Sequence, residues 1–296
     1  MSSPASAPDG AAAAAAVAAE LVSGASLEIG AHRPQDAREI AALLPAGTPV
    51  YVNHLPRHRL LDTVPTLAAV RRAGLEPVPH IAARRIGSRE EFAEFLARAA
   101  GEANVKKALI LGGDEPEAAG PYAEGAALLR EDLLSRAGLR EVGLPGYPEG
   151  HPRIPRAALE RAFAEKLALA EAQGLGRYLV TQFSFAPARI VEYCASMARS
   201  APGVPVYVGL AGPTDPVALL RFAQRCGVSA SLRALGSQGM NAVRLVTHTD
   251  PADQLTAVAR YCAAHAGCNV VGVHLFTFGG VAAAARWINR QLARAV

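Results

Sequence analysis

Short hydrophobic runs recur along the chain, and segments with apolar residues at helical spacing separate them. Eight strands are expected, at 26–30, 49–53, 76–82, 108–114, 140–148, 177–185, 204–211 and 269–278. The intervening segments, for example 33–47 and 89–103, carry the apolar pattern of amphipathic helices. Two helical stretches precede the last strand, and another follows it.

This alternation predicts an α/β fold with a parallel sheet, because parallel neighbours must be joined by crossover connections that are usually helices. Eight such units close into a (β/α)8 barrel, the TIM barrel. The alternative is an open doubly wound sheet, which would carry a glycine-rich G-x-G-x-x-G turn after its first strand. The segment "SLEIGAHRPQ" lacks that turn, so we expect a single barrel.

An extra helix is expected before the barrel. The alanine-rich segment from about Gly10 to Val22 favours a helix, after a disordered lead. The domain organisation is therefore a lead and helix at 1–22 and a barrel at 23–296. The alanine run has no positively charged segment before it and is too short and too weakly apolar to span a membrane. We expect a soluble, cytoplasmic protein with no membrane contact.

Composition narrows the choice of partners and compartment. The formal net charge is +4, and no basic run is present, so we expect no nucleic-acid partner. None of the four cysteines forms a C-x-x-C pair. Free thiols in a reducing cytosol are the preferred interpretation of all four.

Polar residues gather where the predicted strands end, and barrel enzymes carry their active sites at the carboxyl ends of their strands. A single histidine at such a place is more often a hydrogen-bonded structural residue than a ligand. The loop "LPGYPEGHP" after the fifth strand adds further polar and aromatic residues, as a rigid segment of the rim. The candidates are Glu28, Asn53, His54, His80, Asp114, Tyr147, Glu149, His151, Gln182 and His274.

Glu28 differs from the other candidates, because it lies between Leu27 and Ile29 within a strand and should point into the barrel. Removing a carboxyl group from water raises its pKa, which suits a general acid. A metal site could be assembled from His80, Asp114, Glu149 and His151. Their spacing contains no local metal-binding motif, and we assign no metal.

Several motifs together resemble a known family. "SLEIG", "VPHIAARR", "LILGGD", "GPYAEGAALL", "GYPEGHP", "LVTQFSF" and "GVHLFTF" occur in the order, and near the spacing, of the methylenetetrahydrofolate reductases. The resemblance extends from about Ser26 to Phe278, and "GYPEGHP" and "TQF" are its most specific parts. It implies a TIM barrel that binds FAD without a Rossmann fold.

The resemblance also implies an activity and roles for residues. The family passes a hydride from NADH or NADPH to FAD and then to 5,10-methylenetetrahydrofolate, forming 5-methyltetrahydrofolate. Glu28 resembles the general acid that helps to open the folate ring, Asp114 lies near both flavin and pterin, and Gln182 contacts folate. A homo-oligomer is expected. The implied flavin-binding residues are Asn53, His80, Gly113, Asp114, Tyr122, Ala123, Tyr147 and His151.

The chain departs from the family at several positions. Gly112 stands where the family often has arginine, and Asn53 replaces a flavin-contacting threonine. Gly279 and Gly280 replace an Asn-Arg pair whose arginine grips the folate glutamate tail, and Lys166 is only a weak match to a phosphate-contacting lysine. Two alternatives follow: a flavin-free reductase that takes its hydride directly from NADH, and a folate-binding barrel without turnover.

Overall fold

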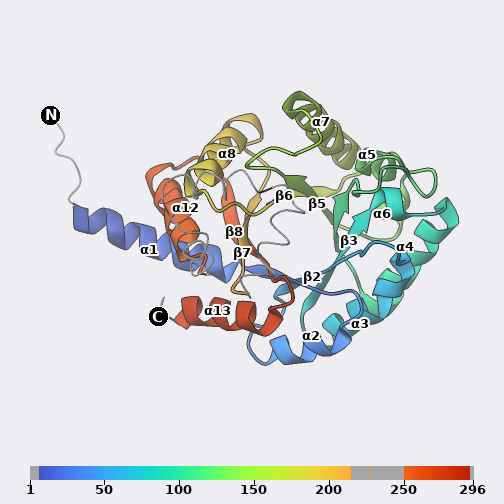
Figure 1. Cartoon of the computed structure of the whole chain (residues 1–296), viewed down its shortest axis with the longest axis horizontal. Helices are drawn as coiled ribbons and strands as arrows, with labels where there is room; N and C mark the ends of the chain where they lie inside the picture. The colour runs from blue at the N-terminus through green and yellow to red at the C-terminus, as the bar shows by residue number, and fades with distance from the viewer. Residues whose placement is uncertain (1–6, 215–227, 229–249, 294–296) are drawn as a thin grey trace. The chain divides into compact units, whose positions relative to one another are not determined.

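The eight expected strands form a closed barrel, in the order β1 to β8 along the chain (Figure 1). The computed structural model describes residues 7–214, 228 and 250–293. Parallel pairing joins β1 through β5 in succession and joins β7 to β8. The (β/α)8 prediction is confirmed. The strands are β1 Ser26–Ile29, β2 Pro49–Val52, β3 Glu76–Ala82, β4 Lys107–Leu111, β5 Glu141–Gly146, β6 Gly176–Thr181, β7 Val206–Ala211 and β8 Val270–Phe276.

Helices occupy the connections, as the sequence pattern predicts. Ser88 caps the longest helix between β3 and β4 by accepting a hydrogen bond from the Glu91 N–H at 3.1 Å, and Asn104 ends that helix with a left-handed φ of 48°. The helices are α1 Ala7–Ser23, α2 Pro34–Ala41, η1 Leu60–Thr63, α3 Val64–Arg72, η2 Ala83–Arg85, α4 Arg89–Ala103, α5 Gly125–Leu129, α6 Leu133–Arg136, α7 Arg156–Ala172, α8 Pro187–Ser200, α12 Ala252–Ala264 and α13 Val281–Ala293.

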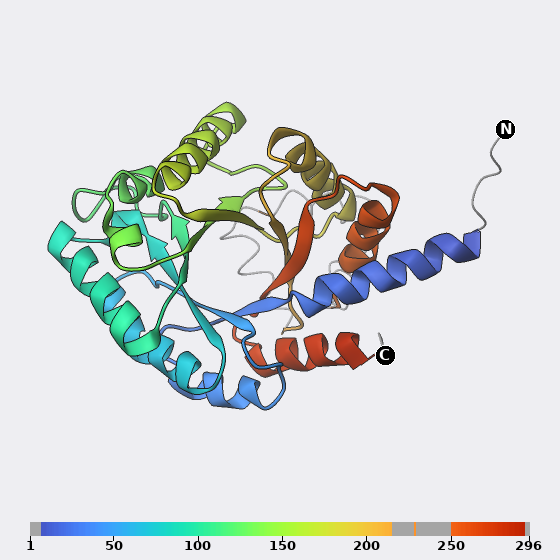
Figure 2. The same cartoon turned by 180° about the vertical axis from the view of Figure 1, so that it is seen from behind.

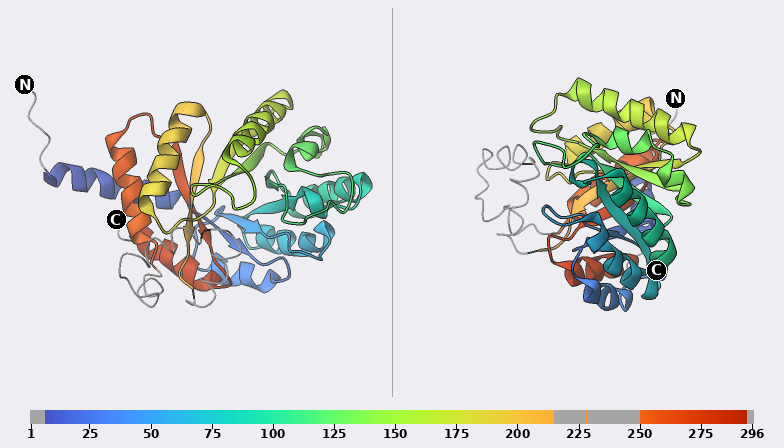
Figure 3. Two further views of the ribbon diagram at one scale, coloured as in Figure 1. Left: turned by 45° about the horizontal axis from the view of Figure 1, so that its top comes forward. Right: turned by 90° about the vertical axis from the view of Figure 1, so that its right-hand side faces the viewer.

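The chain divides into two compact units. Unit 2 comprises Leu27–Pro145 and Arg153–Leu179, and unit 1 comprises Met1–Ser26, Gly146–Pro152 and Val180–Val296. In unit 2, α2 packs on α3 and α3 packs on α4 along the outside of the strands (Figure 2). In unit 1, α12 packs against both α1 and α8 (Figure 3). None of the described helices is long and apolar enough to cross a membrane.

The interior of unit 2 contains aromatic polar side chains as well as aliphatic ones. The Tyr51 hydroxyl donates a hydrogen bond to the Tyr178 hydroxyl at 3.3 Å, and both residues are buried. Tyr51 belongs to β2 and Tyr178 to β6, which is on the opposite side of an eight-stranded barrel, so the bond crosses the interior. Gly143 on β5 leaves room for the Tyr178 ring, because a Cβ there would lie 2.6 Å from the ring carbon Cε2.

Element boundaries differ from the predictions mainly at the carboxyl ends of strands. The sixth strand was expected to reach residue 185 and ends at Thr181, and the eighth was expected to reach residue 278 and ends at Phe276. The aromatic residues beyond these ends, Phe185 and Phe278, pack against Phe183 outside the sheet. Their strand-like composition explains why the predicted strands are too long. The N-terminal helix begins at Ala7, earlier than expected, with proline in its first turn, where proline is tolerated. The earlier of the two helical stretches expected before β8 lies outside the described residues.

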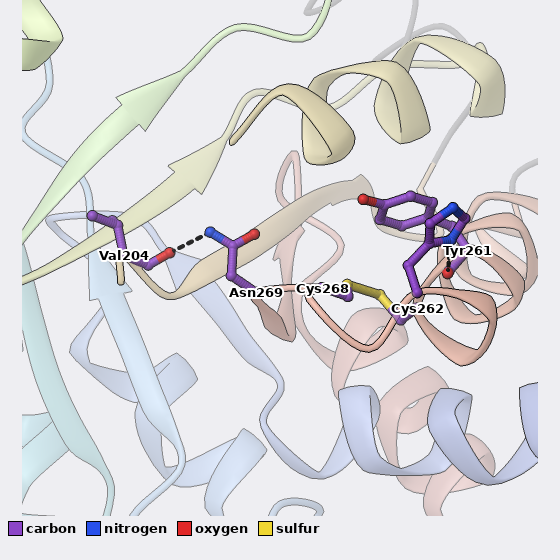
Figure 4. The surroundings of a disulfide bond; sticks show 6 residues. Val204, Tyr261, Cys262, Cys268 and Asn269 are labelled. Carbon is purple, nitrogen blue, oxygen red and sulfur yellow. Dashed lines mark hydrogen bonds between the residues drawn. A yellow bond between two sulfur atoms is a disulfide. The ribbon is translucent and has the colours of Figure 1, made fainter. Parts of the chain in front are cut away.

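The prediction of free thiols was wrong for two cysteines. Cys262 at the end of α12 and Cys268 before β8 form a disulfide, with their Cα atoms 5.2 Å apart (Figure 4). The next residue, Asn269, donates hydrogen bonds to the carbonyl oxygens of Ala201 and Val204 at 3.1 and 2.8 Å. Sequence spacing missed the pair because the bend between α12 and β8, and not a C-x-x-C motif, brings the sulfurs together.

Cys194 remains a free thiol in α8. Burial raises its pKa to about 12, which makes it an unreactive thiol at neutral pH. Cys226 lies outside the part of the chain that the structure describes.

The close contact at Gly143 gives the first prediction. Gly143→Ala should lower the free energy of unfolding by about 1–3 kcal/mol, because the added methyl overlaps the Tyr178 ring inside the barrel. Gly101→Ala in α4 is the matched control, since nothing lies within 4 Å of its added Cβ. It should raise the free energy of unfolding by about 0.5–1 kcal/mol through helix propensity. Urea unfolding measures both changes, and equal effects would contradict the steric argument.

Candidate active site

The predicted acid lies inside the barrel wall. Glu28 is only 9% exposed and stands beside Tyr51 in the β1–β2 register. Paired residues on neighbouring strands project from the same face of a sheet, so the two side chains lie next to each other. Glu28 is therefore a buried carboxyl group beside a tyrosine ring.

His54 follows β2 and is held on both ring nitrogens. Its Nε2 contacts the His58 carbonyl oxygen at 3.2 Å, and its Nδ1 accepts a hydrogen bond from the Ala82 N–H at 3.4 Å. Burial lowers its pKa to about 4, and the nearby Arg85 charge acts in the same direction. His54 is therefore neutral at pH 7 and fixes the loop after β2, which is the structural role expected of a single histidine.

Two buried polar atoms near the ends of β2 and β3 have no hydrogen-bond partner in the part of the chain that the structure describes. The Nε2 atom of His80 and the Oδ1 atom of Asn53 are buried and have no hydrogen-bond partner among the described residues. The His80 ring lies edge-on to Tyr51, with centroids 5.7 Å apart. Burial lowers the pKa of His80 to about 3, helped by His54 and Arg85. His80 can therefore offer a hydrogen bond to a ligand at neutral pH, but not a positive charge.

The loop after β4 places Asp114 at the surface. Gly113 has a φ of 98°, which favours glycine, and a Cβ there would lie 2.9 Å from the carboxylate of Glu115. The side chain of Asp114 is 78% exposed, and Arg153 pairs with it at 3.1 Å. Asp114 thus belongs to the rim, while Glu28 belongs to the barrel wall.

Sequence reasoning missed the residues that fix this loop. Arg85 in η2 forms a 2.6 Å ion pair with Glu115, and it also donates a hydrogen bond to the carbonyl oxygen of His54. Arg84 donates to the carbonyl oxygens of Ala123 and Glu115 at 2.7 and 2.8 Å. The consecutive arginines directly after a strand were the available signal.

The electrostatic balance at Glu115 favours the carboxylate. Burial raises the pKa of Glu115, but hydrogen bonds from Arg85 and from backbone N–H groups outweigh that effect and lower the pKa overall. Glu115 is therefore ionised at neutral pH, and it holds Arg85 in place.

Two predicted cofactor contacts lie in different surroundings. Tyr122 is buried, packs edge-on to Phe92 and donates a hydrogen bond to Glu131 at 2.9 Å. Burial and Glu131 raise its pKa. Ala123, the next residue, is exposed, and its carbonyl oxygen accepts a hydrogen bond from Arg84.

Lys166, the weak match to a phosphate-contacting lysine, lies on α7. Burial lowers its pKa to about 8.

In unit 1, the rim loop and the "TQF" motif are joined through the backbone. The Gln182 N–H donates to the Gly146 carbonyl oxygen at 2.7 Å. The Gln182 side-chain oxygen accepts a hydrogen bond from the Phe183 N–H at 3.1 Å. In the same loop, the rings of Tyr147 and His151 meet edge to face, with centroids 5.3 Å apart.

Four phenylalanines gather at the ends of β6 and β8 in unit 1. Phe183 is fully buried, and Phe185, Phe276 and Phe278 pack around it at centroid distances of 5.2–5.6 Å. Phe278 adopts a left-handed φ of 49°, which is unusual for a residue other than glycine. His274, deeper in β8, lies 2.9 Å from the Ser26 hydroxyl through its Nδ1.

Across the described residues, no group of three or more His, Cys, Asp or Glu side chains could hold a metal ion. The four-residue metal set considered from the sequence is split between the two units: His80 and Asp114 belong to unit 2, and Glu149 and His151 belong to unit 1.

The fold and these side chains define a (β/α)8 barrel with polar residues at the carboxyl ends of its strands. No protein-family model matches the chain. A protein assigned as a phosphonomutase from Burkholderia cenocepacia J2315 is similar, with a TM-score of 0.52 and 14% identity over 92% of this chain and 93% of that one. A 7,8-dihydropteroate synthase from Vibrio fischeri ES114 gives a TM-score of 0.48 and 11% identity over 91% and 93%. The first similarity supports the barrel fold alone.

The buried His54 predicts a pH-dependent stability. Its pKa is about 4 in the folded chain against an ordinary value of 6.5. Below pH 6.5 the unfolded chain therefore binds a proton that the folded chain excludes, and stability falls as the pH drops towards 4. The loss should amount to about 3 kcal/mol for this residue.

His54→Gln should make the pH dependence of the unfolding free energy shallower, since it removes the titrating ring. Urea unfolding at several pH values from about 7 to 4 measures this loss. His265→Gln, which removes an exposed ring, is the control. Identical slopes in wild type and His54→Gln would refute the assignment.

Proposed function

We propose that this protein reduces 5,10-methylenetetrahydrofolate to 5-methyltetrahydrofolate, or catalyses the reverse oxidation, with NADH or NADPH as the hydride donor. The observation that carries the proposal is the position of Glu28, a buried carboxyl group on β1 beside Tyr51. The resemblance in "SLEIG", "GYPEGHP" and "TQF" supplies the substrate class.

Glu28 would act as the general acid. Protonation of a ring nitrogen allows the carbon–nitrogen bond of the five-membered folate ring to break, which leaves a cationic iminium group. A hydride adds readily to that carbon and forms the methyl group. A group that promotes this opening stabilises the transition state rather than the closed substrate, which is how binding energy raises the rate.

The resemblance assigns folate binding to Gln182, and it assigns to Asp114 a place near the flavin and the pterin. The Gln182 oxygen is held by the Phe183 N–H, so its amide nitrogen remains as the group that can donate to a folate acceptor. Asp114 is exposed on the rim, where Arg153 fixes its direction. The Asp114 carboxylate would accept a hydrogen bond from a pterin bound beside the loop after β4.

Two observations support a flavin ring near the ends of β2 and β3. The buried Nε2 of His80 and Oδ1 of Asn53 have no partner in the described part of the chain and would hydrogen-bond to the polar edge of the ring. FAD, when bound, would take the hydride from the nicotinamide and pass it to folate.

A specific observation favours the flavin-free alternative as a second candidate. Arg84 and Arg85, which contact the β4 loop, are occupied by carbonyl oxygens and by Glu115. The diphosphate of FAD would have to compete with these protein acceptors. Direct transfer from NADH to folate needs no diphosphate site at this loop.

Glu28→Gln should lower kcat for NADH-dependent methylfolate formation by about 10²-fold or more, because an amide cannot supply the proton. Bound cofactor and thermal stability should remain near wild type. Glu102→Gln, an exposed acid on α4, is the control and should retain full activity. Full activity in Glu28→Gln would refute the acid role.

An absorbance spectrum distinguishes the two candidates. Bands near about 380 and 450 nm that bleach with anaerobic NADH would indicate a competent flavin. A colourless protein that forms methylfolate without added FAD, at a rate that FAD does not change, would establish the flavin-free route. We expect the flavin bands, and their absence from active protein would overturn the flavin assignment.

A further inference from the structure

Two neighbouring loops of unit 2 carry exposed basic side chains at the carboxyl end of the barrel. The loop after β1 carries His32 and Arg33, and the loop after β2 carries Arg57, His58 and Arg59. All five residues are exposed. We call these five residues the basic loop patch. Both loops begin directly after strands that carry candidate site residues, Glu28 in β1 and Asn53 at the end of β2.

A contact between two histidines brings the loops together. The Nε2 atom of His32 lies 3.0 Å from the Nδ1 atom of His58, and their ring centroids are 4.3 Å apart. One ring must therefore donate its N–H to an unprotonated nitrogen of the other. The contact brings the two loops together, with Arg33 next to His32 in one loop and Arg57 and Arg59 on either side of His58 in the other.

Buried side chains hold the backbone of the basic loop patch by hydrogen bonds. His54 contacts the carbonyl oxygen of His58, and the Thr66 hydroxyl donates to the carbonyl oxygen of Ala31 at 2.5 Å. These bonds fix the backbone of His58 itself and of Ala31, the residue before His32. The side chains of the patch are exposed, whereas hydrogen bonds hold the backbone that carries them.

Three acids lie beside the patch: Asp36 and Glu91 pair with two of its arginines, and Asp62 accepts a hydrogen bond from the Arg59 N–H at 3.0 Å. Arg33 pairs with Asp36 at 2.9 Å and Arg59 with Glu91 at 3.4 Å, each through its Nε atom, and both arginine side chains remain more than half exposed. Arg57 has no ion pair within the described residues. It also adopts a left-handed φ of 64°, a conformation that costs free energy for a residue with a side chain and that tends to occur at functional sites.

We infer that the basic loop patch binds an anionic group of a ligand whose reacting part lies at Glu28. This inference rests on the proposed function, which offers two sources of such an anion: the carboxylates of a γ-glutamyl tail on folate and the phosphates of the nicotinamide donor. Arginine forks match both groups. The turn after β8, with Gly279 and Gly280, offers neither a charge nor a side chain for the same task.

Arg57→Gly is the sharpest test. Glycine adopts a φ of 64° without strain, so the variant removes the charge and should fold at least as stably as wild type. Arg156→Ala on α7, whose side chain is 82% exposed, is the matched control for loss of a surface arginine.

The source of the anion follows from which ligand loses affinity. If the tail binds, KM for a pentaglutamyl substrate should rise about three- to tenfold in Arg57→Gly, with kcat, KM for the monoglutamate and KM for NADH unchanged. If the phosphates bind, KM for NADH should rise by that factor instead. Unchanged constants for all three ligands would overturn the inference.

Direct binding separates this inference from the proposed function. Calorimetric titration with a tetra-γ-glutamate peptide and with NADH requires no turnover. Weaker binding of either probe to Arg57→Gly than to wild type and to Arg156→Ala supports the patch even if folate reduction is never observed. Equal binding to all three proteins, alongside normal folate reduction by wild type, would overturn the patch and leave the proposed function standing.

Discussion

One partly buried guanidinium links the loops that follow β2, β3 and β4 in unit 2. Arg85 follows β3, reaches the carbonyl oxygen of His54 after β2 and pairs with Glu115 after β4. The two side chains are only 13% and 27% exposed, so water screens the pair less than it screens a surface ion pair. The pair links the loop that carries His54 to the loop that carries Glu115, and these residues directly follow Asn53 and Asp114 in the chain.

Burial is the main cause of the lowered pKa values of His54 and His80, and the charge of Arg85 acts in the same direction. These two histidines are therefore neutral at physiological pH, and they can take part in hydrogen bonds without adding positive charge.

The alternation of strands and helices predicted the barrel because each run buries apolar side chains at its own period. The position of Glu28 was predictable for the same reason, since an acid between Leu27 and Ile29 can only face the opposite side of the strand. The predicted strands extend too far at their carboxyl ends because Phe185 and Phe278 have strand-like chemistry but pack on one another outside the sheet.

Other features depend on which parts of the chain meet in space. The Tyr51–Tyr178 bond joins positions 127 residues apart, and the partner of Arg85 lies 30 residues away. The Cys262–Cys268 disulfide depends on the bend between α12 and β8. No local sequence pattern specifies which distant residues come into contact. The binding roles assigned to Tyr147, His151 and Gln182 remain predictions, although the structure places each of them at or beside the carboxyl end of β5 or β6.

The space for Tyr178 inside the barrel has a consequence for how this sequence can diverge. The ring of Tyr178 fills the volume that a side chain at residue 143 would otherwise occupy. The two positions therefore share one volume, although they lie on different strands. A related chain with a larger residue at 143 must carry a smaller one at 178, and it would lose the phenol that meets Tyr51 across the interior. Co-variation of residues 143 and 178 among relatives would thus record whether a given member of the lineage has kept the tyrosine pair.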